Sequence, residues 1–470
     1  MRVCSTPLRL GTGLLLMALP VTAAAETLVL EGATLYDGSG GAPVEDAVVV
    51  VEDGEIACAG DAGACPVPDG AERHDLSGKW LMPGLVDAHV HLWQTGFFDS
   101  RPDAADLRDE LPYMEGQTRQ RRDPDRYFDA WLCSGITAAF DVGGYPWSVD
   151  LARGLDGGQE DPHLAATGPL ITHAPREIMN LPGEKVMIPM ESEEEAREAV
   201  RYVASLEADA AKLWFLPVAE ADQQEAIDTR VAALAEAADK HGIPLVTHAT
   251  SLREAKVAVE AGTDVLVHGV FDEEVDETFL ASAREADVVY VPTMIVTRGY
   301  LDTYRAMTGD HPFELDDPHD CVDEDTRALL EGADRFADHE AVAQRDSEWQ
   351  TAFEERIEAQ EENMASNLAA VHEAGITVAA GTDAGNPGTV HGPSIYAELE
   401  TMQAAGIEPA ELIPMATANG AQAMGREDFG IVEAGRKADL IVLDADPGED
   451  IGNLREMSGV MRGGQWFREP

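Results

Sequence analysis

The chain has 470 residues, which is enough for a large enzymatic core and a smaller accessory domain. Its 88 acidic residues outnumber its 33 basic residues and give a formal net charge of −55 at pH 7. This charge argues strongly against nucleic acid or an anionic membrane surface as a partner. Because the acidic residues are spread along the chain, we expect a solvated surface suited to high salt, and therefore a halophilic source.

Residues 1–25 have the three-part pattern of a secretory signal peptide. Arg2 and Arg9 precede an apolar stretch that ends in small residues at positions 23–25. The stretch is shorter than the roughly 20 residues that a membrane span requires, so a membrane anchor is the less favoured alternative. We expect cleavage near Ala25 and a soluble protein in the periplasm or outside the cell.

Four cysteines remain after such a cleavage: Cys58, Cys65, Cys133 and Cys321. In an oxidising compartment a short disulfide loop between Cys58 and Cys65 is favoured over four free thiols. The sequence leaves the partners of the other two cysteines open.

Both ends of the chain have the pattern of short β-strands. Residues 27–80 contain β-branched runs broken by glycine, with Asp53-Gly54 as a hairpin turn signal. Residues 430–446 and 459–467 have the same pattern of β-branched runs and glycines. The ends therefore predict β-structure, in contrast to the middle of the chain.

In the middle, strand-like apolar runs alternate with helical patterns. A capping box of Ser192 and Glu195 opens one predicted helix, and Gly242 ends the next. The strand-like runs number eight and lie near residues 85, 137, 165, 211, 245, 265, 288 and 377. Eight alternating units favour a (β/α)8 TIM barrel over an open doubly wound sheet, which more often has about five or six strands. The long segment from about 297 to 375 predicts a lid or wall over the barrel mouth.

Five side chains that suit a metal ion lie at the ends of predicted strands. His89 and His91 in "LMPGLVDAHVHLW" point to the same face because residues i and i+2 of a strand share a face. His248 ends "PLVTH", His268 ends "VLVH" and Asp383 ends "TVAAGTD". Imidazole nitrogen and carboxylate oxygen bind divalent ions such as zinc. Because barrel sites are built where strands end, we expect these five side chains in one metal site.

Lys212 is a sixth candidate, inside the apolar strand "AAKLWFL". Lysine is rarely buried without a partner. Either its amine reaches solvent or pairs with a nearby Asp, or it is carboxylated by carbon dioxide and becomes an anionic ligand that bridges two metals. The recurrence of strand-end ligands favours the carboxylated form.

The order His, His, Lys, His, His, Asp, together with "LMPGLVDAHVHL", "GTDAG" and "GIVEAGRKADLIVLDADP", resembles the amidohydrolase superfamily. It is most similar to the binuclear subtype with a carboxylated lysine, and to imidazolonepropionase-like and Xaa-Pro dipeptidase-like members. The resemblance implies a metal-dependent hydrolase barrel over residues 84–425. It also implies that residues 26–83 and 426–470 form one small composite β-sandwich domain beside the barrel.

The resemblance implies two divalent metal ions, for which we expect zinc. One ion is assigned to His89, His91 and Asp383, the other to His248 and His268, with carboxylated Lys212 as the bridge. Relatives that use a single metal keep the His pair, one later His and the Asp. An unmodified lysine would therefore place the chain among those relatives.

This ligand set implies hydrolysis by a water shared between two ions, which loses its proton near neutral pH. We expect Asp383 to accept that proton and to pass it to the leaving amine. His268 or His391 is expected to orient the substrate or to stabilise the oxyanion. His173 and Asp141 are further pocket candidates, and Arg176 is a candidate for binding a substrate carboxylate.

The expected function is an exported amidohydrolase that cleaves an amide bond in a small molecule: a peptide, an Xaa-Pro dipeptide or an N-acyl amino acid. Two alternatives are kept. One is a mononuclear cyclic-amide hydrolase like imidazolonepropionase, and the other is a periplasmic metal or small-molecule binding protein without catalysis. The sequence leaves the oligomeric state open, a homo-oligomer included.

Overall fold

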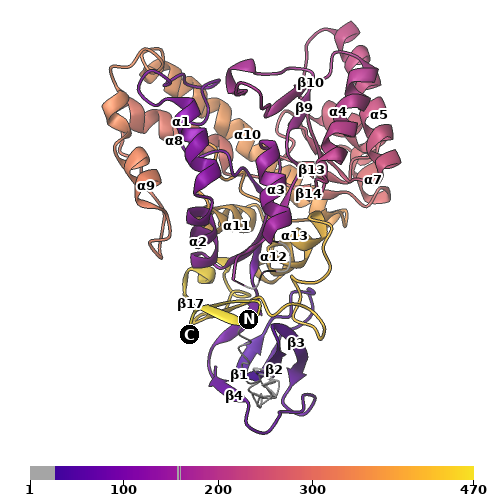
Figure 1. Ribbon diagram of the computed structural model, residues 1–470, viewed down its shortest axis with the longest axis vertical. Coiled ribbons are helices and arrows are strands. Elements are labelled where there is room, and N and C mark those ends of the chain that lie inside the picture. The colour runs from indigo at the N-terminus through magenta and orange to yellow at the C-terminus, as the bar shows by residue number, and fades with distance from the viewer. Residues whose placement is uncertain (1–26, 156–157, 159) are drawn as a thin grey trace, which may run out of the picture.

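The computed structural model describes residues 27–155, 158 and 160–470, so the predicted signal peptide lies outside the described residues. Figure 1 shows a β-rich part at one end of the molecule, where indigo strands from the N-terminal region lie beside yellow strands from the C-terminal region. The helices and the remaining strands form the larger part. No helix among the described residues is both long and apolar enough to cross a membrane.

The two ends of the chain form one eight-stranded sheet. Its order is β18 (Gln465–Arg468), β17 (Met457–Arg462), β16 (Leu440–Leu443), β5 (Trp80–Pro83), β1 (Thr27–Leu35), β2 (Val44–Glu52) and β3 (Glu55–Asp61), and β4 (Glu72–Asp75) pairs with β1. The junction is β5, which pairs in parallel with β1 and antiparallel with β16. Leu30 and Val49 from one end pack in a single buried cluster with Leu440 from the other. The strands predicted at the two ends therefore share one core.

The middle of the chain forms two parallel sheets. One consists of β6 (Leu85–Val90), β7 (Ile136–Asp141) and β8 (His163–Ala166). The other has the order β10 (Met187–Pro189), β9 (Leu170–Thr172), β11 (Ala211–Trp214), β12 (Leu245–His248), β13 (Val265–Val267), β14 (Val289–Val291) and β15 (Thr377–Val378). The predicted α/β class with parallel strands is confirmed, and all eight predicted strand positions are strands. The short strands β9 and β10 were not predicted.

Backbone hydrogen bonds connect β6 to the residues that follow β15. The N–H of Ala88 donates to the carbonyl of Ala380 at 3.0 Å, and the N–H of Asp383 donates to the carbonyl of His89 at 2.8 Å. The N–H of His91 donates in turn to the carbonyl of Ala384 at 2.8 Å. The first and last strands of the central segment are thus neighbours, which brings their polar ends together.

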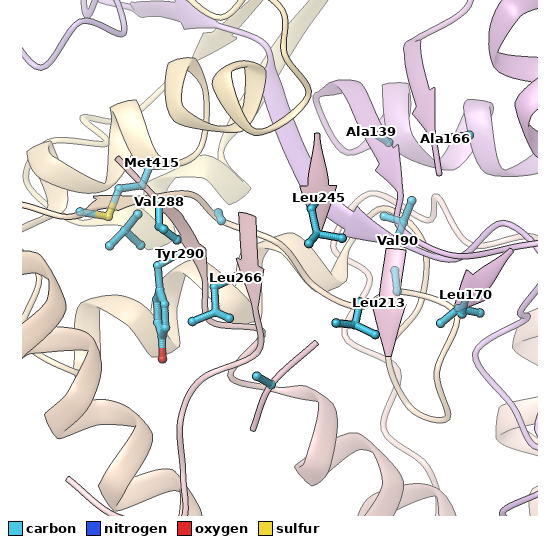
Figure 2. Packing of buried hydrophobic residues seen from close by; sticks show 14 of the residues in the cluster. Val90, Ala139, Ala166, Leu170, Leu213, Leu245, Leu266, Val288, Tyr290 and Met415 are labelled. Atoms are coloured by element: carbon cyan, nitrogen blue, oxygen red, sulfur yellow. The ribbon is translucent and has the colours of Figure 1, made fainter. Parts of the chain in front are cut away.

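Side-chain alternation along the strands separates an apolar outer face from an inner face. Leu213, Leu245 and Leu266 come from the neighbouring strands β11, β12 and β13, and each is at most 1% exposed (Figure 2). They belong to the large cluster that the helices complete. Lys212, next to Leu213 in sequence, points to the opposite face and pairs in register with Val246, which lies in a separate buried cluster. The amine of Lys212 is therefore on the inner face.

The helices follow the predicted alternation. They are α1 (Tyr113–Arg122), α2 (Asp125–Cys133), α3 (Pro146–Leu155), α4 (Glu193–Ser205), α5 (Ala221–His241), α6 (Leu252–Ala261), α7 (Glu277–Glu285), α8 (Val296–Thr308), α9 (Glu324–Glu331), α10 (Ser347–Glu373), α11 (Ser394–Ala404), α12 (Pro409–Met415) and α13 (Ala418–Ala423). As predicted, the Ser192 side chain caps α4 by accepting from the N–H of Glu195. As predicted, α5 ends at Gly242, whose φ of 66° suits glycine.

Two disulfides are present. Cys58 and Cys65 are bonded across β3 and the turn that follows it, as predicted. Cys133, at the end of α2, is bonded to Cys321, in the segment between α8 and α9. The second bond, which the sequence left open, ties the long insertion between β14 and β15 to the helix that precedes β7.

Candidate active site

The structure brings all six predicted ligands together around one cavity of about 210 Å³. They come from five different strands or from the residues that follow them. They are His89 and His91 at β6, Lys212 in β11, His248 at the end of β12, His268 after β13 and Asp383 after β15. The insertion supplies part of the wall, because Tyr300 of α8 and Met364 of α10 also line the cavity.

Three of the six side chains form a compact group. Oδ1 of Asp383 lies 3.0 Å from Nε2 of His91 and 3.4 Å from Nε2 of His89. The ligand atoms of all three lie within 4.8 Å of one another. Nδ1 of His91 is 2.8 Å from the carbonyl oxygen of Gly143, so Nδ1 carries the proton and the lone pair of Nε2 faces Asp383. This donor set fits a divalent cation.

The remaining histidines lie beside this group. The rings of His248 and His268 have centroids 4.1 Å apart, and the His268 ring is 5.0 Å from that of His89. Nδ1 of His268 is 2.7 Å from Oγ1 of Thr293, which fixes the orientation of the ring. His268 and Asp383 have φ angles of 76° and 58°, a conformation that L residues adopt rarely and that marks functional sites.

The buried polar atoms of the cavity lack protein partners. Among the described residues, no hydrogen bond reaches either ring nitrogen of His89, Nζ of Lys212 or Oδ1 of Asp383. Unpaired buried polar atoms are costly, so native proteins rarely leave several of them in one place. A bound cation would satisfy Oδ1 of Asp383 and one ring nitrogen of His89, so these residues fit a metal ion.

Burial sets the protonation states of the site. It lowers the pKa of His89, His248 and His268 well below the ordinary value, and the positive charge of Lys212 adds to the effect. These imidazoles are therefore neutral and able to act as ligands. Burial also lowers the pKa of Lys212 to about 7, although the Asp383 carboxylate opposes the shift. A large part of this amine is thus uncharged at neutral pH and able to react as a nucleophile.

A buried carboxylate missed from the sequence supports the first strand. Asp87 accepts hydrogen bonds from the N–H of His89 at 3.2 Å, and from the N–H and the hydroxyl of Thr382 at 3.0 and 2.6 Å. Burial raises its pKa to about 7. Asp87 therefore ties β6 to the turn that carries Asp383. The spacing Asp-x-His on one strand face was an available signal.

A second buried carboxylate supports the turn after β14. Glu398 of α11 accepts hydrogen bonds from the N–H groups of Met294 at 2.9 Å and Ile295 at 3.2 Å. Burial raises its pKa to about 8. The turn that it holds includes Thr293, the partner of His268. A glutamate on the buried face of a helix beside Ile395, Leu399 and Met402 was the missed signal.

The four other predicted pocket residues do not line this cavity. His391 is buried against Tyr127, with ring centroids 4.0 Å apart. Nε2 of His173 lies 3.0 Å from the carbonyl oxygen of Leu216. Asp141 is buried and accepts a hydrogen bond from the N–H of Leu92. Arg176 lies on the surface, with its guanidinium 5.8 Å from the ring centre of Trp214.

The cavity contains a different arginine, Arg101, together with Tyr300 and Asn386. Arg101 follows the loop sequence "QTGFFDS", which has no strand or helix periodicity to show where its side chains point.

Sequence comparisons relate the chain to a known family. The model of the Amidohydrolase family matches residues 80–467. Imidazolonepropionase from Rhodococcus jostii (strain RHA1) is 26% identical over 442 residues, which cover 89% of this chain and 87% of that protein. Imidazolonepropionase from Nocardia farcinica (strain IFM 10152) is 25% identical over 423 residues, which cover 85% of this chain and 86% of that protein.

Solved structures show the same fold. A Xaa-Pro dipeptidase with bound methionine in its active site has a TM-score of 0.68 and 20% identity, over 94% of this chain and 100% of that chain. Ochratoxinase from A. niger has a TM-score of 0.68 and 20% identity, over 95% of this chain and 97% of that chain. The family model extends over most of the chain, so this protein belongs to the amidohydrolase family and is a hydrolase that acts on carbon–nitrogen bonds.

Proposed function

We propose that the protein is an exported, metal-dependent amidohydrolase that cleaves an amide bond in a small peptide or an N-acyl amino acid. The observation that carries this proposal is the set of six metal-ligand side chains around one cavity. Among the described residues, no hydrogen bond reaches the ring nitrogens of His89, Nζ of Lys212 or Oδ1 of Asp383. The neutral imidazoles and the carboxylate are suited to zinc.

The ligand positions support two ions. Nε2 of His89, Nε2 of His91 and Oδ1 of Asp383 would hold one ion, and His248 and His268 would hold the other, with carboxylated Lys212 between them. The uncharged, buried amine of Lys212 has the state that carboxylation requires. When bound, such a pair of ions polarises the scissile carbonyl and lowers the pKa of water.

The chain's own residues would move the proton. Asp383 turns Oδ1 toward His89 and His91, and its other oxygen lies 4.0 Å from Nδ1 of His268. This second oxygen is placed to accept a proton from the attacking water and to deliver it to the leaving nitrogen. Because Asp383 and the surrounding histidines are largely buried, bulk water does not compete for the proton.

The same proposal includes the finer architecture. The bonds from β6 to residues 380–384 support a closed (β/α)8 barrel over residues 84–425. The eight-stranded sheet of both chain ends supports a composite β-sandwich domain of residues 26–83 and 426–470. The two disulfides support export to an oxidising compartment after cleavage of residues 1–25.

A second candidate is a mononuclear cyclic-amide hydrolase. His89, His91 and Asp383 form the compact group on their own, and the relatives that match most of the chain include imidazolonepropionases. An unmodified Lys212 and one ion per chain would favour this candidate over the binuclear one.

The experiment is a hydrolysis screen of zinc-loaded protein at high salt, with metal content measured on the same sample. The panel contains dipeptides with and without C-terminal proline, N-acyl amino acids and cyclic amides. We expect two zinc ions per chain and turnover of linear amides. Turnover of cyclic amides alone with one ion would favour the second candidate, and full metal occupancy without any turnover would contradict an enzymatic role.

A further inference from the structure

The cavity has two chemically different sides beyond the metal ligands. One side is a polar group that we name the anchor cluster: Arg101, Tyr300 and Asn386. The other is an apolar wall: Met179, Met187, Trp214, Phe271 and Met364. A charged anchor and an apolar wall suit the two chemically different halves of a bound amide.

Arg101 has unused donors. Its Nε and Nη2 donate to the two carboxylate oxygens of Asp103 at 2.9 and 3.0 Å, and Nη1 donates to Oδ1 of Asn386. A guanidinium has five N–H groups, so these three bonds leave one on each terminal nitrogen without a partner among the described residues. Two neighbouring N–H donors match the two oxygens of a carboxylate.

The anchor cluster is rigid and lies on the Asp383 side. The hydroxyl of Tyr300 donates to Oδ1 of Asn386 at 2.8 Å, and the Arg101 guanidinium lies 5.7 Å from the centre of the Tyr300 ring. The side-chain amide of Asn386 donates to the carbonyl oxygen of Asp383 at 3.3 Å. The donors of Arg101 are thus tied to the turn that carries the proposed proton carrier.

The apolar wall includes Trp214, which lies beside the His248 ligand. The rings of Trp214 and His248 have centroids 6.0 Å apart. Met187 comes from β10 and Met179 from the 3-10 turn Glu177–Met179, both in the segment between β9 and α4. Methionine side chains are unbranched and adapt to irregular apolar groups.

We propose that the substrate is an N-acyl amino acid or dipeptide whose leaving half carries a free carboxylate bound by Arg101, and whose acyl half is bulky and apolar. The proposal rests on the proposed function, because Asp383 delivers a proton to the leaving nitrogen. The leaving half must therefore lie near Asp383, where the anchor cluster is, and the acyl half near the apolar wall.

The reaction balances as a hydrolysis. The oxygen of water forms a bond to the acyl carbon, the carbon–nitrogen bond breaks, and the nitrogen takes a proton through Asp383. The products are an apolar carboxylate and a free amino acid. No oxidant, reductant or further reactant is required.

The test compares three small amides on the zinc-loaded enzyme. N-benzoyl-L-alanine has the proposed arrangement, N-benzoyl-L-alaninamide lacks the carboxylate, and the mono-benzylamide of succinic acid places its carboxylate on the acyl half. We expect kcat/KM for the first to exceed that for each of the others by about 100-fold, because a site built for an ionic hydrogen bond rejects analogues that lack it. Equal turnover of all three would overturn the proposal.

Substitutions then assign the effect to residues. Arg101→Gln should raise KM for N-benzoyl-L-alanine by about 10- to 100-fold. The KM for N-benzoyl-L-alaninamide, which lacks the carboxylate, should stay the same. The matched control is Arg108→Gln, since Arg108 pairs with Asp106 through the same two-bond geometry, at 2.7 Å for each bond, on the surface. If Arg101→Gln unfolds because Asp103 is left unpaired, Arg101→Gln combined with Asp103→Asn removes both buried charges. An equal rise in KM for N-benzoyl-L-alanine and N-benzoyl-L-alaninamide would contradict the proposal that Arg101 binds the carboxylate.

The apolar wall is tested separately. Met187→Gln should reduce the preference for N-benzoyl-L-alanine over N-acetyl-L-alanine, and a wild-type enzyme without that preference would contradict the assignment of the wall. If the wild type hydrolyses no amide, the proposed function fails.

In that case the role of Arg101 can still be tested by binding. Binding of N-benzoyl-L-alanine is measured by the fluorescence of Trp93 and Trp214, which line the cavity. Binding that weakens about 10-fold in Arg101→Gln supports the anchor, and unchanged binding overturns it.

Discussion

Oδ1 of Asp383 lies 3.0 Å from Nε2 of His91, although the two residues come from the last and the first strand of the central segment. The N–H of Asp383 also donates to the carbonyl oxygen of His89. Backbone hydrogen bonds therefore hold the carboxylate next to the histidine pair.

Asp383→Asn tests the proton carrier. The amide keeps the shape of the side chain but cannot accept and return a proton, so kcat should fall by about 100- to 10,000-fold. Steady-state kinetics and zinc analysis on the same sample separate lost proton transfer from lost metal. Asp239→Asn, on the exposed face of α5, is the control. Unchanged activity in Asp383→Asn would show that another group carries the proton.

Lys212→Met tests the bridging ligand. It should lower the zinc content from about two ions per chain to about one. In the metal-free protein the same change should raise the free energy of unfolding by about 1–3 kcal/mol, because it removes a buried amine that has no hydrogen-bond partner in the described part of the chain. Lys240→Met, at an exposed position, should change neither quantity.

Intact-protein mass spectrometry supplies a direct readout for the same residue. Wild type treated with zinc and bicarbonate should gain the mass of one carbon dioxide, and Lys212→Met should not. A wild-type mass that never increases, together with two bound zinc ions, would contradict carboxylation.

Much of this site could be predicted from the sequence, because the direction of side chains in a β-strand follows from their spacing. Residues two apart share a face, and parallel strands end at one edge, so His89, His91 and His248 could be expected together. The same rule does not apply in loops. Arg176, the candidate for binding a substrate carboxylate, is exposed beside the cavity residue Trp214, whereas Arg101, in an equally irregular segment, lines the cavity itself.

The supporting carboxylates could not be assigned from the sequence for another reason. Asp87 and Glu398 act through residues that are distant in sequence, Thr382 and Met294, and a single sequence does not show such pairs. The closing contact between β6 and the residues after β15 is likewise a property of tertiary structure.

Glu398 predicts a dependence of stability on pH. Its pKa is raised from 4.5 in the unfolded chain to about 8 in the folded protein, so between these values the folded state holds a proton that the unfolded chain has lost. Its contribution to stability is therefore complete below about pH 4.5 and is lost as the pH rises toward about 8. The loss should amount to a few kcal/mol in the metal-free protein.

Urea unfolding of metal-free wild type and Glu398→Gln at several pH values checks this. The variant lacks the titrating group, so its free energy of unfolding should fall less between pH 4.5 and 8. Glu225→Gln, on the exposed surface of α5, should behave like wild type. Parallel pH profiles for all three proteins would contradict the role assigned to Glu398.

The disulfides predict unequal effects on stability. Cys133 and Cys321 are separated by 188 positions, whereas Cys58 and Cys65 are separated by 7. Replacing both cysteines of the long-range bond by serine should lower the free energy of unfolding by about 2–5 kcal/mol, and replacing the short-range pair should cost less. Chemical unfolding of the two double variants checks the order, and the reverse order would contradict the tethering role of the Cys133–Cys321 bond.

Anomalous diffraction from crystals of the zinc-loaded protein tests the metal site most directly. The account predicts one peak within bonding distance of Oδ1 of Asp383 and Nε2 of His89 and His91, and a second peak beside His248 and His268, with density for a carboxylated Lys212 between them. A cavity without either peak, in crystals whose zinc is bound elsewhere, would contradict it.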